Sequence, residues 1–374
     1  MASPSLALIP AEDAVRRLRV SRASLYAYVS RGLIRSFSSP HRPRERLYAL
    51  DDVEALVERK ARFRRPAVAA ATALDCGLPV LETSITRIEG GRLSYRGRDA
   101  VLLARTATLE DTALLLIGGL DETAFQRPSR LPDCPGAPAF GPHAFVSQAV
   151  RLLSEPAPRE ARAAEVAAIL RLVAAAGSGA DPGAEPVHRH LARAWNAPPG
   201  AIEPIRRALV LCADHELSSS AFAVRVTAST GASLRNAVIA GLVALSGPYH
   251  GGMTERVRAF LDDPGAFPQP VFRHRLYPGG DPRGPALLEA APLLASDATT
   301  LRAIEAAGER PGLDAALVMM ERAYGLPAGA AFTLFAVGRT AGWLAHAIEQ
   351  RGQARLIRPR AHYRVAEEET PHDR

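Results

Sequence analysis

The 374-residue sequence has few cysteines and lacks long apolar runs, although its composition (47% hydrophobic, 23% charged) is that of an ordinary globular protein. No stretch of about 18 uncharged apolar residues occurs, so we expect no membrane span. No basic region precedes a long apolar stretch at the N-terminus, so we expect no secretory signal. Cys76, Cys134 and Cys212 are too few and too scattered for a disulfide scaffold or a zinc cluster. These absences predict a protein of the reducing cytoplasm.

Lysine is almost absent, since Lys60 is the only one among 46 basic residues. The net charge is +7 and the sequence pI is near 9.7. Residues 1–66 contain 14 basic and 7 acidic side chains, whereas the remaining 308 residues contain 32 of each. The basic excess therefore belongs to the N-terminal segment. A basic segment on a neutral body predicts that only this segment approaches a polyanion.

The pattern of residues 1–66 is compact. It predicts a helix over 11–18, with Ala14 and Leu18 facing inward, and a second helix over 22–30 capped by Ser21. A polar stretch, SFSSPHRPRER, separates these from a further helix that starts at Asp51. Two short helices, a basic loop and another helix describe a winged helix-turn-helix. The alternative is a small helical module for protein contacts, with its arginines merely solvated.

The segments VSRASLYAYVSRGLIRS and RLYALDDVEAL resemble the MerR-type DNA-binding domain. The resemblance implies that the second helix enters the major groove and that the loop after it forms a wing on the DNA backbone. The long dimerising helix that usually follows such a domain is missing, so a dimer must come from the rest of the chain. The implied DNA contacts are Arg22, Ser24 and Tyr26 in the groove, and Arg42, Arg44 and Arg46 in the wing.

The rest of the chain is predicted to be nearly all helical. Alternation from Thr83 to Tyr95 around Gly90-Gly91 predicts a β-hairpin, which is the only clear strand signal. Thr108-Leu-Glu-Asp is a capping-box start to an apolar helix. Long Ala/Leu/Arg segments with Gly/Pro breaks follow. The predicted fold class is mainly α, with a small β-hairpin, preceded by a winged helix-turn-helix domain.

Three histidine-bearing segments carry the candidate chemistry. His215 lies in ADHE at a helix junction, His250 in GPYHGG, and His274 in HRLYPGGDPRG. Glycines let a backbone come close to a ligand, and helix N-termini attract anions. Any one of these histidines, taken alone, is more often a solvated or satisfied side chain. No HxxxH pair or neighbouring cysteine occurs, so we predict no metal site.

Six motifs occur in a fixed order over about 150 residues: ADHE, GPxHGG, HxLYxxGDPR, PGLDAAL, LFAVGRTAGWLAH and IRPRxxY. They resemble citrate synthases, and ETSI, LSYRG and LEDTALLLIGG resemble that family's N-terminal part. The resemblance covers about residues 78–364. With the N-terminal segment it points to the bacterial subgroup that carries a helix-turn-helix domain. It implies a dimeric two-domain helical enzyme, with a large domain at 67–251 and 326–374 and a small domain at 252–325, after a head at 1–66.

The implied reaction joins acetyl-CoA to oxaloacetate and releases citrate and CoA, so that the acyl group becomes alkyl on transfer. Acetyl-CoA is a cosubstrate, and no permanently bound cofactor is expected. By the motif match, Asp314 takes the methyl proton, His250 donates to the thioester oxygen and His274 donates to the ketone. General-base catalysis alone gives ~10²–10⁴-fold, so the enolate needs hydrogen bonds placed beforehand. Oxaloacetate is bound by His215, Arg283 and Arg339, and by Arg358 of the partner subunit.

Three departures from the family pattern concern CoA and the acyl group. The loop that packs on the CoA adenine, commonly GxGH, is here Val271-Phe272-Arg273 before the histidine. HGGMTE replaces the usual HGGANE, and Cys212 stands where many members have a histidine. A 2-methylcitrate synthase using propionyl-CoA stays open, because one methylene is worth roughly 1–3 kcal/mol. A DNA-binding, metabolite-sensing regulator built on a synthase body is a second alternative that stays open. The DNA site, effectors and assembly beyond a dimer are also open.

Overall fold

The structure is a computed structural model that describes residues 8–30, 33–39, 46–64, 81–128, 137–156, 162–264 and 274–361. Contacts within the chain divide it into two compact units. The smaller consists of residues 1–82 and 361–374, and the larger of residues 83–360. Each unit has a hydrophobic core of its own.

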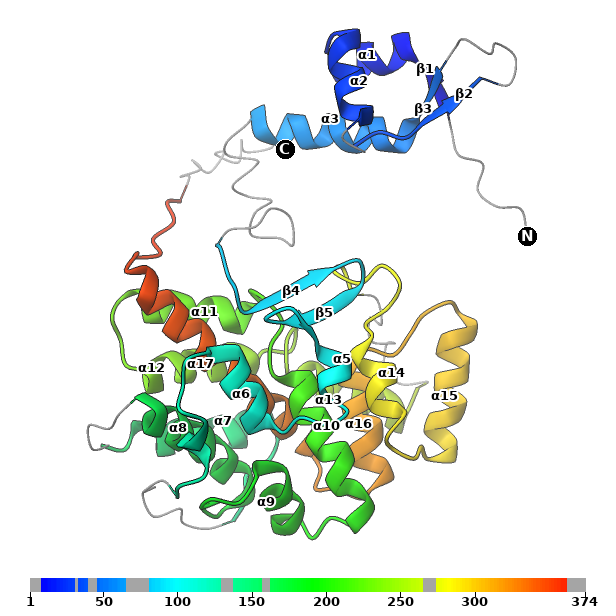
Figure 1. Cartoon of the computed structure of the whole chain (residues 1–374). Coiled ribbons are helices and arrows are strands. Elements are labelled where there is room, and N and C mark those ends of the chain that lie inside the picture. The colour runs from blue at the N-terminus through cyan, green and yellow to red at the C-terminus, as the bar shows by residue number, and fades with distance from the viewer. Residues whose placement is uncertain are drawn as a thin grey trace, which may run out of the picture. The chain divides into compact units, whose positions relative to one another are not determined.

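The described part of the smaller unit combines helices with a short antiparallel sheet of strand order β1-β3-β2 (Figure 1). Its elements are β1 (Leu8–Pro10), α1 (Ala11–Leu18), α2 (Arg22–Ser30), β2 (Ser36–Ser38), β3 (Arg46–Ala49) and α3 (Leu50–Arg64). The helices predicted at 11–18, at 22–30 and from Asp51 are confirmed, the last of them starting at Leu50. The strands were not predicted, because three or four residues are too few for an alternating pattern to show.

The core of the smaller unit explains why these helices form where they do. Ala14 and Leu18 are buried on the inner face of α1, as predicted, and pack with Leu25 of α2 and Tyr48 of β3. Ser21 Oγ accepts the backbone N–H of Ser24 at 3.2 Å, which satisfies one free donor at the start of α2. The N-cap assigned from the sequence is therefore confirmed.

The larger unit begins with the predicted hairpin. Strands β4 (Thr86–Glu89) and β5 (Arg92–Tyr95) pair through a two-residue turn at Gly90 and Gly91. Both glycines have positive φ, +59° and +75°, as a hairpin turn with the favoured twist requires. A third strand, β6 (Arg98–Asp99), pairs with β5 and was not predicted.

The rest of the larger unit is helical, in agreement with the predicted mainly α class. The capping box at Thr108 and Asp111 is confirmed, with both reciprocal hydrogen bonds present. The helices are α5 (Ala100–Leu103), α6 (Leu109–Ile117), η1 (Glu122–Phe125), α7 (Gly141–Ser154), α8 (Arg162–Ser178), α9 (Val187–Ala194), η2 (Pro199–Ala201), α10 (Ile202–Cys212), α11 (Ser219–Ser229), α12 (Leu234–Leu245), α13 (Met253–Asp262), α14 (Arg283–Leu288), α15 (Ala295–Ala306), α16 (Leu313–Ala323) and α17 (Ala330–Gln353).

Helix α17 is the longest of these helices and is buried along most of its length, against α6, α8, α10, α11 and α12 (Figure 1). Two of its glycines allow a close approach to the end of α10. A Cβ on Gly338 would lie 2.6 Å from the Leu209 carbonyl oxygen, and one on Gly342 would lie 2.3 Å from Asp214 Oδ1. The N–H of Gly342 also donates to the Ala213 carbonyl at 3.0 Å. This contact fixes the position of α17 along its axis relative to the loop after α10.

Gly342→Ala is therefore expected to lower the free energy of unfolding by about 1–3 kcal/mol, the usual cost of overpacking a tight core contact. The matched control is Gly352→Ala on the same helix, where an added Cβ meets nothing within 4 Å. There the higher helix propensity of alanine should leave stability unchanged or raise it by up to about 1 kcal/mol. Urea unfolding measures both variants, and equal effects would contradict the close contact.

Candidate active site

His215 lies in the loop between α10 and α11. Ser218 caps α11 by accepting from the N–H of Ala221, and Glu216 Oε1 accepts the N–H of Ile88 from the hairpin at 2.7 Å. These bonds hold the loop on both sides of His215. The His215 ring is buried, and its Nε2 lies 3.0 Å from the Tyr277 hydroxyl.

His274 lies in a short turn before α14, next to His215. The two imidazole centroids are 5.0 Å apart, edge to face. The N–H of Leu276 donates to His274 Nδ1 at 3.2 Å, so Nδ1 is the acceptor and the ring carries its proton on Nε2. Burial and the nearby Arg283 lower the pKa of His274. The ring is therefore a neutral Nε2–H donor at neutral pH.

His250 lies in the tight turn that precedes α13. A Cβ on Gly251 would meet the Leu245 carbonyl oxygen at 2.8 Å, so this turn requires a residue without a side chain. His250 Nε2 is hydrogen-bonded to Ser220 Oγ at 2.8 Å, and Phe335 lies edge-on 6.0 Å away. Burial, with a further contribution from Arg339, lowers the pKa of His250 to about 3, so this imidazole is also neutral.

Arg283 begins α14 and is held by the carboxylate of Asp281. Its Nε and one Nη donate to the two carboxylate oxygens at 2.9 and 2.7 Å, and its backbone N–H donates at 3.0 Å. Burial opposes the charge, but Asp281 raises the pKa of Arg283 above its ordinary value. The other nitrogen, Nη1, is buried and has no partner among the described residues. Arg283 thus presents one free donor.

Asp314 lies in the first turn of α16, directly beyond the contact between α14 and α16. A Cβ on Gly284 would lie 2.2 Å from the Pro311 carbonyl oxygen, so the two helix starts touch. Asp314 Oδ1 is buried and accepts no hydrogen bond from a described residue. Burial raises the pKa of Asp314 to about 6, against the lowering effect of Arg283. This carboxyl group can therefore take up or release a proton near neutral pH.

Arg339 projects from the middle of α17 toward the loop that carries His215. Its Nε donates to the Cys212 carbonyl at 2.7 Å and its Nη1 donates to Ser218 Oγ at 3.2 Å. The guanidinium lies 4.9 Å from the Phe335 ring centroid. Arg339 is almost completely buried, and burial lowers its pKa.

The structure brings six of the predicted site residues into one cluster. Burial lowers the pKa of His215 well below its ordinary value, and the charges on Arg283 and Arg339 lower it further, with smaller contributions from His274 and His250. The pKa of Asp314, which burial raises, is lowered in part by the charges on Arg283 and Arg339. Five elements, far apart in the sequence, therefore meet at this point: the loop before α11, the turn before α13, the start of α14, the start of α16 and the middle of α17.

Three contact residues of the cluster were not singled out from the sequence. Tyr277 bonds to His215, Ser220 bonds to His250, and Phe335 lies against His250 and Arg339. Tyr277 and Phe335 stand inside the motifs HxLYxxGDPR and LFAVGRTAGWLAH, so their place in a motif was the available signal. Ser220 follows ADHE in an ordinary serine-rich helix start, and the sequence there carried no signal of a contact with His250.

The remaining predicted residues are not in this cluster. Arg358 lies in the irregular segment after α17, is exposed, and forms no hydrogen bond or ion pair with a described residue. Arg22, Ser24 and Tyr26 lie on α2, and Arg46 begins β3. Val271, Phe272 and Arg273, assigned to CoA, and Arg42 and Arg44, assigned to the wing, lie outside the described residues. Cys212 contributes its carbonyl to Arg339, and its buried thiol has a pKa raised to about 12.

Comparison with known proteins decides the family. The family profile "Citrate synthase, C-terminal domain" matches residues 136–268 and 269–360. The chain belongs to the citrate synthase family. Citrate synthase 2 of Bacillus subtilis is 33% identical over 191 residues, which are 44% of this chain and 51% of that protein. The 2-methylcitrate synthase 2 of Corynebacterium glutamicum is 30% identical over 200 residues, 46% of this chain and 51% of that protein.

The chain thus spans about half the length of the curated relatives it matches. Solved structures cover more of it. The citrate synthase of Thermotoga maritima superposes with a TM-score of 0.65 at 23% identity, over 80% of this chain and 96% of that one. The citrate synthase of Thermoplasma acidophilum, solved with carboxymethyl coenzyme A and oxaloacetate, gives 0.63 at 23% identity, over 80% and 97%. The larger unit therefore has a citrate synthase fold.

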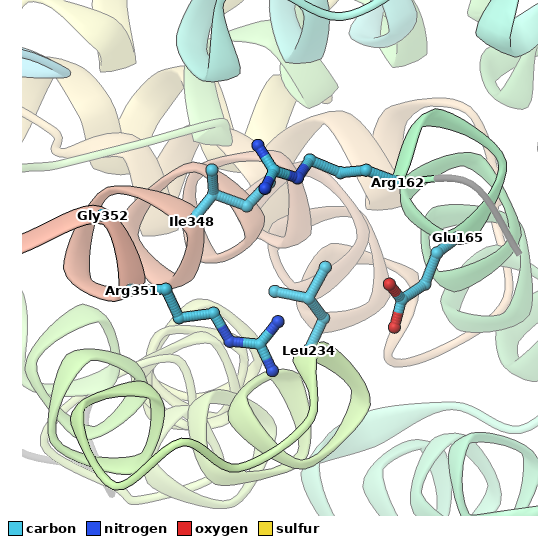
Figure 2. A pocket seen from close by; sticks show the side chains of 6 residues that line it. All are labelled: Arg162, Glu165, Leu234, Ile348, Arg351 and Gly352. Atoms are coloured by element: carbon cyan, nitrogen blue, oxygen red, sulfur yellow. The ribbon is translucent and has the colours of Figure 1, made fainter. Parts of the chain in front are cut away.

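A separate pocket of about 340 Å³ lies where α8 and α12 begin and α17 ends (Figure 2). None of the predicted citrate synthase site residues lines this pocket. Its lining residues are Arg162, Glu165, Leu234, Ile348, Arg351 and Gly352. Among the described residues, no helix is long and apolar enough to cross a membrane. The same part of the chain contains no group of three His, Cys, Asp or Glu side chains that could hold a metal ion.

Asp314→Asn is expected to stabilise the protein at pH 8. The folded pKa of about 6 lies above the ordinary value of 3.8, so folding is opposed by the cost of burying the charged form. That cost is absent below pH 3.8, grows between 3.8 and 6, and is constant above, at up to about 3 kcal/mol. Urea unfolding of both proteins at pH 5 and pH 8 should show a gain that shrinks at pH 5. A gain of the same size at both pH values would contradict the raised pKa.

Proposed function

We propose that this chain catalyses the citrate synthase reaction, in which acetyl-CoA and oxaloacetate give citrate and CoA. The observation that carries the proposal is a buried cluster with two unpaired polar atoms of opposite charge, Arg283 Nη1 and Asp314 Oδ1. An unpaired buried polar group costs about 1–3 kcal/mol, more when it is charged. A ligand that pairs with these atoms recovers this cost.

Oxaloacetate suits the two arginines of the cluster. Arg283 Nη1 and Arg339 Nη2 are each left without a hydrogen bond to a described residue, and an arginine fork binds carboxylate oxygens well. We propose that these groups hold the two carboxylates of oxaloacetate, with His215 as a further donor. A dicarboxylic acid with a ketone then lies beside His274, whose Nε2–H can donate to the ketone oxygen.

The acetyl thioester needs a base and a neutral donor. We propose that Asp314 takes a proton from the methyl group while His250 donates a hydrogen bond to the thioester oxygen. The methyl carbon then bonds to the ketone carbon of oxaloacetate, and His274 supplies the proton for the new alkoxide. Water cleaves the thioester, which releases citrate and CoA. A carboxyl group with a pKa near 6 is a better base than an ordinary aspartate.

The acyl group and the assembly are further parts of the proposal. Acetyl-CoA is our first choice, and propionyl-CoA, giving 2-methylcitrate, is the alternative, since relatives of both names match a similar share of the chain, at 33% and 30% identity. We propose a cytoplasmic dimer in which Arg358 of the partner subunit completes each site. The proposed large domain is 67–251 with 326–374, and the proposed small domain is 252–325.

The test is release of free thiol from acetyl-CoA and propionyl-CoA with oxaloacetate. Asp314→Ala should lower kcat by about 10²–10⁴-fold, the usual contribution of a general base. The control is Asp297→Asn, since Asp297 is a buried aspartate that bonds to Arg322 outside the cluster. It should keep near-normal turnover. Wild-type protein that releases no thiol with either thioester would overturn the proposal.

A second function, DNA binding by the smaller unit, is favoured by its charge and by α2. We propose that the unit is a winged helix-turn-helix whose α2 enters the major groove. Residues 1–66 carry the whole basic excess, and Tyr26 on α2 is 55% exposed although it is aromatic. Among the described residues, Arg22 forms its ion pair with the exposed Glu12, so it can turn to a phosphate or base. A regulator that senses metabolites through the synthase body would combine both functions.

Binding of the full chain to duplex DNA should weaken steeply as salt rises, because neutralised phosphates release counterions. Arg22→Ala should lower the slope of log affinity against log salt concentration by about one. Arg302→Ala, at an exposed arginine of α15 in the other unit, is the matched control and should leave the slope unchanged. Absent or salt-insensitive binding in a gel-shift titration would contradict the proposal.

A further inference from the structure

A buried polar chain leads away from the candidate substrate arginine. Asp214, the residue before His215, is fully buried, and neither of its carboxylate oxygens has a well-aligned hydrogen bond to a described residue. Its Oδ1 lies 3.2 Å from Nε2 of His346, which is also fully buried. The carboxylate has room there only because Gly342, one turn before His346 on α17, lacks a side chain.

His346 is oriented from its other side by Arg225 of α11. The Arg225 Nη1 lies 3.4 Å from His346 Nδ1 and forms a 2.6 Å ion pair with Glu349. Nε of the same arginine donates to Gln350 at 2.9 Å. An arginine can only donate, so His346 Nδ1 is the acceptor and the ring proton is on Nε2, facing Asp214.

The chain is joined to Arg339 through the backbone, since the Cys212 carbonyl, two residues before Asp214, accepts from Arg339 Nε at 2.7 Å. The charge on Asp214 also acts on the guanidinium. Burial alone would raise the pKa of Asp214, yet His346 and Arg339 together lower it, so the group is a carboxylate. Burial lowers the pKa of Arg339, and Asp214 is the largest influence that opposes this. Without a negative charge at Asp214, Arg339 would be a buried cation beside neutral groups, the Cys212 carbonyl, the Ser218 hydroxyl and the Phe335 ring.

We propose that His346 and Arg225 are positioning residues for Arg339: Arg225 fixes the His346 ring, His346 holds the Asp214 carboxylate, and Asp214 sets the guanidinium toward its ligand. Neither His346 nor Arg225 contacts the substrate. The inference rests on the proposed function only in taking oxaloacetate as the ligand of Arg339. Its specific consequence is that the polar chain controls affinity for the dicarboxylic acid and leaves affinity for the thioester unchanged.

Two matched amides at position 346 separate this role from mere packing. Gln places an amide nitrogen near the position of Nε2, so His346→Gln keeps a donor toward Asp214. Asn is one carbon shorter, so His346→Asn keeps an acceptor for Arg225 and loses the donor. We expect His346→Asn to raise both Kd and KM for oxaloacetate about ten-fold, because the Asp214 carboxylate loses its 3.2 Å contact with a polar N–H group. His346→Gln should stay within about threefold of wild type.

The control is the same pair of substitutions at His190. That histidine is equally buried, on α9, and bonds to Ser178 Oγ at 2.7 Å outside the cluster. His190→Asn and His190→Gln should lower the melting temperature without changing either KM. In every variant KM for acetyl-CoA should stay within about twofold of wild type. Calorimetric stoichiometry gives the folded fraction, so Kd can be measured even where a variant folds incompletely.

The outcomes separate the inference from the proposed function. Equal oxaloacetate affinity in His346→Asn, His346→Gln and wild type would overturn the positioning role and leave the function intact. A parallel rise in both KM values would also overturn it, because it would indicate general distortion. Wild type that binds oxaloacetate but releases no thiol would overturn the proposed reaction, while the calorimetric comparison still tests the positioning. Wild type that does not bind oxaloacetate would overturn both.

Discussion

The contact between α17 and the end of α10 is the constraint on which the candidate site depends. Gly338 and Gly342 let the two backbones approach so closely that any side chain at these positions would meet a carbonyl or carboxylate oxygen. Arg339 lies between them on α17, so the contact places this arginine beside the loop, and its bonds to Cys212 and Ser218 hold the guanidinium there. The same approach brings Gly342 against Asp214. Asp214 lies two residues after Cys212, whose carbonyl accepts from Arg339. One backbone contact thus positions a buried cation and a nearby buried anion together.

The cluster contains both paired and unpaired charged atoms. The paired atoms hold the side chains in place, and the unpaired atoms are left to contact a ligand. Arg283 has three bonds to Asp281, which fix its plane, and one free nitrogen. Asp314 has a buried oxygen with no partner. The histidines around them are neutral, because burial and neighbouring arginines remove their charge. Neutral donors beside free charged groups are what a site needs if negative charge is to develop within it.

Much of this could be predicted from the sequence, and the limits have physical causes. Helices at 11–18 and 22–30, the Gly90-Gly91 hairpin and the capping box at Thr108 follow from local propensities, and the structure confirms them. The short strands of the smaller unit depend on tertiary pairing and left no local pattern. The residues of the cluster were predicted from the order of the sequence motifs, because no local rule predicts which helix starts lie side by side. Ser220 and His346 act through contacts that span up to 132 residues, which no spacing rule reveals.

The unpaired nitrogen of Arg283 also links two equilibria at Asp314. The positive field of Arg283 lowers the pKa of this carboxyl group, which burial has raised to about 6. An anion bound at Arg283 cancels part of that field, so the pKa rises and the carboxyl takes up a fraction of a proton. By linkage, the affinity for the anion increases as pH falls through this range. Anion binding at Arg283 would therefore be coupled to proton uptake at Asp314, and the bound anion would make this carboxylate a stronger base.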